Sequence, residues 1–208
     1  MEKKIVLVVM MLLSVIATLA DESPNAKQAR RIFDKVYAQV FGSQGSRLSY
    51  DVNIVGLYKT KGSIKMKGKK QRFSDERVDT WNDGVTAYMV YRKKKTVEIH
   101  NANSDKKDKY SGRFKFTLDD FSYHIAEDPE GLMLTLKQLK TAKGSIKEVK
   151  ALIDRKTFAP IRLRIKVAFI WTTIKISDFK SGGISDDVFV FPRSRYAEGY
   201  KFVDKRGE

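Results

Sequence analysis

Hydrophobic positions recur along this chain with a helical period first and with a strand period afterwards. Between Pro24 and Phe41 the apolar side chains fall three or four residues apart, and charged residues occupy the other side. This spacing predicts an amphipathic helix whose apolar stripe needs a surface to cover. Ser23 and Pro24 have the character of a helix start, and the glycine-containing segment 42–46 ends the pattern.

Alternating apolar and polar positions then predict a series of antiparallel strands with one buried face. The first group comprises five strands, expected near residues 48–55, 64–69, 71–81, 85–92 and 96–101. A hairpin turn is expected at Asn82-Asp83-Gly84, because Asp-Gly between two strands favours a tight turn. The second group comprises four strands and two short edge segments, expected near residues 132–136, 149–153, 161–167, 172–179, 187–191 and 200–204.

The segment between the two groups of strands lacks this alternation. Residues 103–109 are polar and predict a loop, and residues 118–126 predict a short helix with Phe121 and Ile125 on one side. We therefore expect an α+β fold in which a curved antiparallel sheet forms a half-open β-barrel. The N-terminal helix and the helical insertion would cap it and enclose a hydrophobic pocket. With no internal repeat or linker, residues 21–208 are expected to form one domain.

The first 20 residues have the composition of a secretory signal. Lys3 and Lys4 precede an apolar run of 16 residues, which ends with the small residues Thr18 and Ala20. The run is shorter than the roughly 20 residues that a membrane-spanning helix needs. We therefore predict a signal peptide over residues 1–20, cleaved after Ala20, and an exported mature protein.

The composition excludes several kinds of chemistry. The chain has no cysteine and only two histidines, His100 and His124. Disulfides, thiolate nucleophiles, cysteine-ligated zinc and three-histidine metal sites are therefore impossible. The sequence has no G-x-S-x-G nucleophile elbow and no phosphate-binding glycine loop. The adjacent carboxylates Asp119 and Asp120 fit a helix start as well as they fit catalysis. We expect no enzymatic activity, no metal and no cofactor.

The chain is strongly basic, with 41 Lys and Arg against 25 Asp and Glu and a formal net charge of +16. Several of these cations, including Lys65, Lys67 and Arg164, alternate with apolar residues and so belong to the outer face of the predicted sheet. This pattern fits a solvated face that resists aggregation. It also fits attraction to an anionic partner, either lipid headgroups or an acidic protein. Nucleic acid is disfavoured as a partner because the protein is expected to be exported.

Taken together, these motifs resemble the LolA-like family of periplasmic outer-membrane lipoprotein carriers and its LolB and RseB-type relatives. The stretch Gly62–Lys67, the turn Asn82-Asp83-Gly84 with Tyr88 after it, and the strand–turn–strand of residues 153–160 follow the family's order. The ending 203–206 is similar to a terminal strand of related carriers. The resemblance covers most of the mature chain. One family feature is missing, because the Arg-Pro that the family ties to lid closure and release is replaced here by Gly68-Lys69.

The resemblance implies a monomeric carrier in the periplasm of a Gram-negative bacterium, with no nucleic-acid partner. Its partners would be the acyl chains of lipoproteins or another lipid, an inner-membrane release complex and an outer-membrane acceptor. The expected lipid cavity is lined by Val52, Ile54, Met66, Met89, Tyr91, Ile99, Leu134, Leu163 and Ile174. An alternative is an RseB-like sensor of the same fold that binds lipoprotein and a protein partner. A hydrolase with an unrecognised site is the third hypothesis.

Overall fold

The computed structural model describes residues 23–54, 58–104 and 117–207, except for the side chains of residues 53, 54 and 58. The signal peptide predicted over residues 1–20 therefore lies outside the described residues, and so does most of the predicted loop 103–109. Within the described ranges, no helix combines the length and the apolar character needed to cross a membrane.

The predicted helix is confirmed as α2 (Pro24–Phe41). The Ser23 hydroxyl accepts a hydrogen bond from the Ala26 amide at 3.1 Å, which satisfies one of the free donors at the helix start. At the other end, the Gly42 amide donates to the Ala38 carbonyl at 2.9 Å. The helix buries its apolar side against the sheet.

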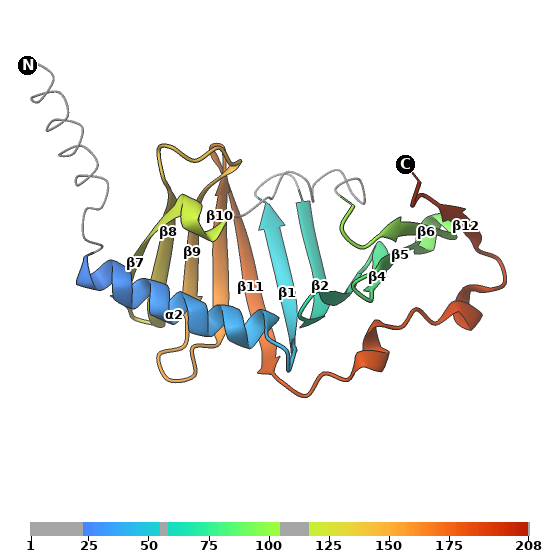
Figure 1. Cartoon of the computed structure of the whole chain (residues 1–208), viewed down its shortest axis with the longest axis horizontal. Helices are drawn as coiled ribbons and strands as arrows, with labels where there is room; N and C mark the ends of the chain where they lie inside the picture. Colours follow the sequence, from blue (N-terminus) through green and yellow to red (C-terminus); the bar gives the residue numbers. More distant parts are fainter. Residues whose placement is uncertain (1–22, 55–57, 105–116, 208) are drawn as a thin grey trace, which may run out of the picture.

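In the described part of the chain, twelve strands form one curved sheet (Figure 1). In chain order they are β1 (Ser46–Ile54), β2 (Tyr58–Lys67), β3 (Lys70–Asp75), β4 (Val78–Asn82), β5 (Thr86–Tyr91), β6 (Thr96–Asn101), β7 (Phe121–Asp128), β8 (Gly131–Gln138), β9 (Ile146–Ile153), β10 (Pro160–Val167), β11 (Ile170–Ser181) and β12 (Lys201–Asp204). Short 3-10 turns are η1 (Arg92–Lys94), η3 (Leu118–Asp120), η4 (Asp186–Phe189) and η5 (Arg193–Tyr196).

Across the sheet the order is β12-β6-β5-β4-β3-β2-β1-β11-β10-β9-β8-β7. Two antiparallel meanders, β1 to β6 and β7 to β11, are joined because β1 pairs with β11. The edge strand β12 runs parallel to β6. The α+β fold with a large curved antiparallel sheet, left open at its edges, is confirmed. Among the described residues, α2 is the helix that caps it.

The helix predicted over residues 118–126 is wrong. The segment forms the turn η3 and then the edge strand β7. Phe121, Tyr123 and Ile125 are buried while the residues between them are exposed, which is the period of a strand. The segment expected as an edge strand at 187–191 is also different, because it contains the 3-10 turn η4.

The single strand predicted over residues 71–81 is two strands. Asp75 closes a tight turn between β3 and β4, since its carboxylate accepts hydrogen bonds from the Arg77 amide at 2.7 Å and the Val78 amide at 2.8 Å. Short polar side chains at such positions satisfy the backbone donors of the turn. The prediction missed this turn because the segment contains neither glycine nor proline.

The two faces of the sheet are covered differently. We call the face on which α2 lies the helix-side face and the opposite one the outer face. Ala29 and Ile32 of α2 pack on the helix-side face against a buried cluster from β7 to β9 that includes Ile125 and Leu134. Helix and edge strand are also tied by polar contacts, because the Asn25 amide nitrogen donates to the Ile125 carbonyl at 2.7 Å.

The outer face of β4 to β6 is covered by the chain that follows β11. Phe191 stacks on Tyr88 with ring centroids 4.3 Å apart, and its ring lies 5.5 Å from that of Trp81. Tyr196 and Phe202 complete this aromatic cluster. The segment then forms β12 at the sheet edge, so the C-terminal chain acts as a strap across β4 to β6 (Figure 1).

A charged network lies beside the aromatic cluster and is centred on Asp79 of β4. Its side chain is 9% exposed, and one oxygen lies 3.1 Å from the Arg72 guanidinium while the other binds Arg92. The Ser74 hydroxyl donates to it at 2.5 Å. Burial alone would raise the pKa of Asp79, but the hydrogen bonds from Ser74, Arg92 and Arg72 outweigh burial and hold this pKa below its ordinary value. Arg72 also lies 3.6 Å from the Trp81 ring centroid.

Replacing Asp79 by Asn should lower the free energy of unfolding by about 2–3 kcal/mol at pH 7, because two cations lose their buried partner. The pKa of Asp79 is lower in the folded chain, so its stabilisation is present above about pH 4 and is lost as the pH falls further. The difference between wild type and variant in urea unfolding should therefore shrink toward pH 3. Asp34→Asn is the control, since that side chain is 57% exposed. Equal losses in the two variants at pH 7 would contradict the network.

Replacing Phe191 by Ala should cost about 2–3 kcal/mol of unfolding free energy, because the ring packs between Tyr88 and Tyr196. The adjacent Val190 is 64% exposed, so Val190→Ala should change stability by less than about 0.5 kcal/mol. Urea unfolding of both variants measures the contrast. Limited proteolysis should cut the strap faster in Phe191→Ala; unchanged cutting and stability would show that the strap does not hold the sheet.

Candidate functional site

The candidate site is a row of apolar side chains on the helix-side face. The strand registers place one residue from each of six neighbouring strands side by side: Ile125, Leu134, Ala151, Leu163, Ile174 and Val52. Because paired residues point to the same face, this row continues across the junction between the two meanders. A parallel row contains Val149 and Ile165.

Burial along this row changes from one end to the other. Leu134 is 1% exposed and Ala151 is 7% exposed, since both lie in the cluster beneath α2. Leu163, Ile174 and Val52 are only partly buried. The helix crosses the sheet from β7 to β1, and its residue Val40 packs with Val52 and Ile174 (Figure 1). It covers the β7 and β8 end most fully, while the part of the row on β10, β11 and β1 keeps some apolar surface in contact with solvent.

The outer face of the same strands has the opposite character. Between the inward residues of β10 stand Arg162, Arg164 and Lys166, and Lys175 occupies β11 opposite Arg162. On β10 and β11, cations therefore occupy the outer face and apolar residues occupy the helix-side face. The apolar surface of these two strands is confined to the helix-side face.

Seven of the predicted lining residues have described side chains on the helix-side face. Val52, Leu163 and Ile174 are direct neighbours in the row. Met66 is buried with Leu48 and Tyr50 beside the row. The remaining three are separated from this group. Met89 and Tyr91 lie on β5, several strands away, and Leu134 is covered by α2.

Two predicted residues fall outside this group. Ile99 pairs with Tyr88 and so lies on the outer face, 8% exposed and next to β12. Sequence alone could not place it, because β5 is apolar on both faces and so does not show which of its faces continues the apolar side of β6. Ile54 ends β1, and its side chain lies outside the described residues.

The prediction omitted some residues that lie on the helix-side face. Ile165 is partly buried in the second row, and Ile64 pairs with Phe73 beside Tyr50. The alternation in β10 could have identified Ile165, because Ile165 lies two residues after Leu163 and so points to the same face. Phe73 lies in β3, just before the turn at Asp75 that the prediction missed, so its strand and face were harder to assign.

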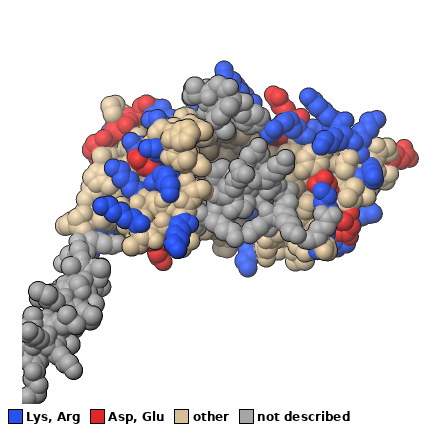
Figure 2. All heavy atoms as spheres, turned by 90° about the horizontal axis from the view of Figure 1, so that it is seen from above, with Lys and Arg blue, Asp and Glu red and all other residues tan. Residues whose placement is uncertain are grey.

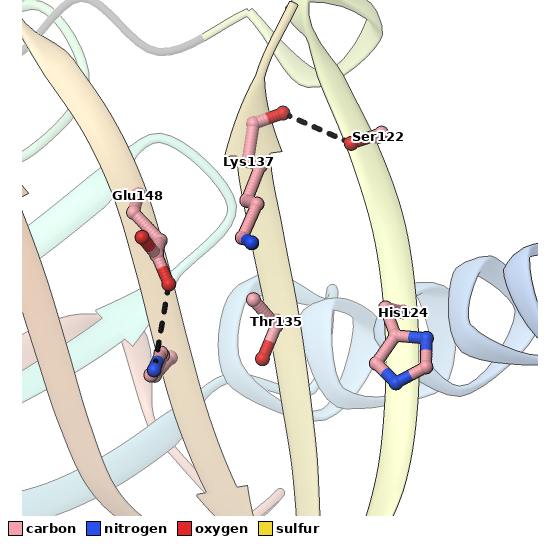
Figure 3. A pocket seen from close by; sticks show the side chains of 6 residues that line it. Ser122, His124, Thr135, Lys137 and Glu148 are labelled. Atoms are coloured by element: carbon pink, nitrogen blue, oxygen red, sulfur yellow. Dashed lines mark hydrogen bonds and ion pairs between the residues drawn. The ribbon is translucent and has the colours of Figure 1, made fainter.

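Two hollows formed by described residues are polar, and neither is the deep apolar pocket that the sequence predicts. One of about 220 Å³ lies on the outer face, where Ser122, His124, Thr135, Lys137, Glu148 and Lys150 project from β7, β8 and β9 (Figure 3). The other, of about 560 Å³, is lined largely by charged residues of β1, β2 and β11. The apolar row is a partly exposed surface.

The outer-face hollow contains residue types that could suggest catalysis, but their contacts differ from a catalytic relay. The Ser122 hydroxyl donates to the Lys137 carbonyl at 3.3 Å, and Glu148 pairs with Lys150 at 3.5 Å (Figure 3). His124 therefore has neither residue as its partner in this arrangement. In the described part of the chain, no group of three or more His, Asp or Glu residues could hold a metal ion.

No protein-family model matches the chain, and no curated protein sequence matches it. Solved structures resemble it in fold. Lipoprotein LppX from Mycobacterium tuberculosis is 9% identical, with 79% of this chain and 100% of that chain covered and a TM-score of 0.49. A LolA superfamily protein from Nitrosomonas europaea is 9% identical, with 78% and 97% covered and a TM-score of 0.39.

A DUF1329 family protein from Desulfovibrio piger is 14% identical, with 80% of this chain and 97% of that chain covered and a TM-score of 0.42. LolA-like proteins are thus among the structures that this chain resembles. At these identities the likeness concerns the fold alone.

The different burial of Ile99 and Leu163 gives a test of where each lies. Ile99→Ala should lower the free energy of unfolding by about 2–3 kcal/mol, because a buried side chain leaves a cavity. Leu163→Ala should cost clearly less, since Leu163 already contacts solvent. Urea unfolding of the two variants measures both losses of unfolding free energy. An equal or larger loss for Leu163→Ala would show that the row is closed core.

Proposed function

We propose that this protein is a periplasmic carrier that binds acyl chains of lipoproteins, or of another lipid, on the helix-side face. It would receive them from an inner-membrane release complex and deliver them to an outer-membrane acceptor. The supporting observation is the partly exposed apolar row Leu163, Ile174 and Val52, which α2 covers incompletely. Neighbouring apolar side chains that reach solvent are a common feature of surfaces that bind a ligand or partner.

The geometry suits a ligand that must be released. Burying an acyl chain contributes about 0.8 kcal/mol per methylene, so about eight methylenes would contribute at most about 6 kcal/mol. That corresponds to a dissociation constant of order 10⁻⁵ M. A fully enclosed lipid anchor would be held far more tightly. A surface covered on one side only therefore favours reversible binding.

The absence of a catalytic arrangement among the described residues is compatible with this role, because carriage needs no bond to be broken. Export is proposed on the basis of the first 20 residues, which have the pattern of a secretory signal. The same export would place the protein where lipoproteins cross between two membranes.

The test is native mass spectrometry of protein exported to a periplasm and purified without detergent, followed by uptake of a synthetic triacylated lipopeptide. Wild type should carry lipid or take up the lipopeptide. Leu163→Glu should bind the lipopeptide at least about tenfold more weakly, because a charge would have to be buried under the chain. Ile174→Asn should weaken binding in the same direction.

The matched control is Arg164→Glu, which places the same new carboxylate one residue away on the outer face. It should bind the lipopeptide as wild type does. Circular dichroism and urea unfolding confirm that each variant folds. A wild type that is empty and takes up no lipopeptide would reject the carrier, and capture of a protein partner would then favour the sensor hypothesis. Equal binding by Leu163→Glu and wild type would reject this surface.

A further inference from the structure

The β10–β11 hairpin presents the most exposed large apolar side chain of the described residues. Phe169 is 85% exposed, and the next residue, Ile170, is 40% exposed. The loop has two residues, Ala168 and Phe169, since Val167 pairs with Ile170. Ala168 has a φ of 52°, a conformation that glycine or asparagine adopts more easily. Folding alone would favour glycine at the first loop position and a polar residue at the second, so the exposed phenylalanine needs another explanation.

The connection between β8 and β9 lies beside this hairpin. The Ala168 amide donates to the Ser145 carbonyl at 3.3 Å, which holds the two loops together at one end of the sheet (Figure 1). Leu139 in this connection is 41% exposed. Lys140, Lys143 and Lys147 are exposed around it. We call Leu139, Phe169, Ile170 and these three lysines the rim patch.

The chain segments that carry the rim patch are basic. Residues 131–147 and 160–177, which form β8, β10, most of β11 and the two loops, contain no Asp or Glu. The acidic residues beside them are Asp119 and Asp120 of η3, where the Leu139 amide donates to the Asp120 carbonyl at 2.8 Å and Asp119 is paired with Arg30. Figure 2 looks down on this end of the molecule, where Lys and Arg side chains stand among uncharged surface and some acidic side chains. Glu148 is the nearest acid along the chain, and it is paired with Lys150.

An aromatic residue with cations around it lies just behind the tip. Trp171 is partly buried on the outer face, with the Arg164 guanidinium 4.8 Å and the Lys166 ammonium 5.8 Å from its ring centroid. Tryptophan beside lysine and arginine is typical of the membrane–water interface, where the ring lies at the level of the headgroups.

We infer that the rim patch docks the protein on an anionic phospholipid bilayer. Phe169 and Ile170 enter the boundary between headgroups and acyl chains, and the lysines bind the headgroup phosphates. A bilayer fits better than an acidic protein, because a two-residue tip offers little of the roughly 800 Å² per partner that a stable protein interface buries. This inference does not require acyl binding by the helix-side face.

The test is co-sedimentation with vesicles of phosphatidylcholine alone and of phosphatidylcholine with 30 mol % phosphatidylglycerol. Wild type should bind the anionic vesicles and bind them less at 0.5 M than at 0.1 M salt, since salt screens surface charge. Phe169→Ser with Ile170→Ser should weaken binding about tenfold or more. Lys140→Gln with Lys143→Gln should weaken it about 25-fold, at roughly fivefold for each lysine.

Matched controls change equally exposed residues elsewhere. Val85→Ser removes a 78% exposed apolar side chain at the β4–β5 turn, and Lys156→Gln with Lys180→Gln removes two exposed lysines away from the patch. Both controls should bind vesicles as wild type does. Trp171 fluorescence should shift to the blue on binding, and Trp171→Phe should lose that shift, because Trp81 is only 4% exposed.

The outcomes separate this inference from the proposed function. Rim-patch variants should still take up lipopeptide in solution, and Leu163→Glu should still bind vesicles. The docking surface would be overturned if wild type did not bind anionic vesicles. It would also be overturned if the rim-patch variants bound these vesicles as well as the controls do. Binding of an acidic protein without binding of vesicles would also overturn it.

Discussion

The pairing of β1 with β11 is the interaction on which the rest of the structure depends. It joins two meanders that would otherwise be separate sheets with additional open edges. Its register sets Val52 beside Ile174, about 120 residues away in sequence, and so makes the apolar rows of the two meanders continuous. Ordering such a distant pairing requires closing a long loop, which predicts slow folding relative to helical proteins of this size.

The joined sheet is wider than one helix can cover. α2 completes a core with β7, β8 and β9, where Leu134 and Leu136 are almost fully buried. Between the two ends of the helix, Leu163 and Ile174 continue the same face with partial exposure, although each packs in a cluster that includes α2 residues. The proposed lipid-binding surface is therefore a consequence of incomplete cover by a single helix. It needs no separate binding loop among the described residues.

The outer face of the sheet avoids exposed apolar surface in two ways. On β10 and β11 it is charged, so it requires no cover. On β4 to β6 it is apolar, with Trp81 and Val90 buried, and the C-terminal strap supplies the aromatic side chains that pack against it. The Asp79 network adds charge beside that cluster and compensates two arginines there. The outer face is therefore solvated through charged residues on β10 and β11 and covered by the strap on β4 to β6.

Local patterns determined the opening helix, the antiparallel character of the strands and the basic outer face, because alternation and helical period depend on neighbours in sequence. The same patterns placed Leu163 and Ile174 on the apolar face. They could not assign Ile99 to a face of the whole sheet, since the neighbouring strand β5 is apolar on both sides. They mistook β7 for a helix because a short apolar run fits both periods. Strand order, the reach of α2 and the strap over β4 to β6 were decided by tertiary structure, since alternation tells which face a residue takes but not which strand lies beside it.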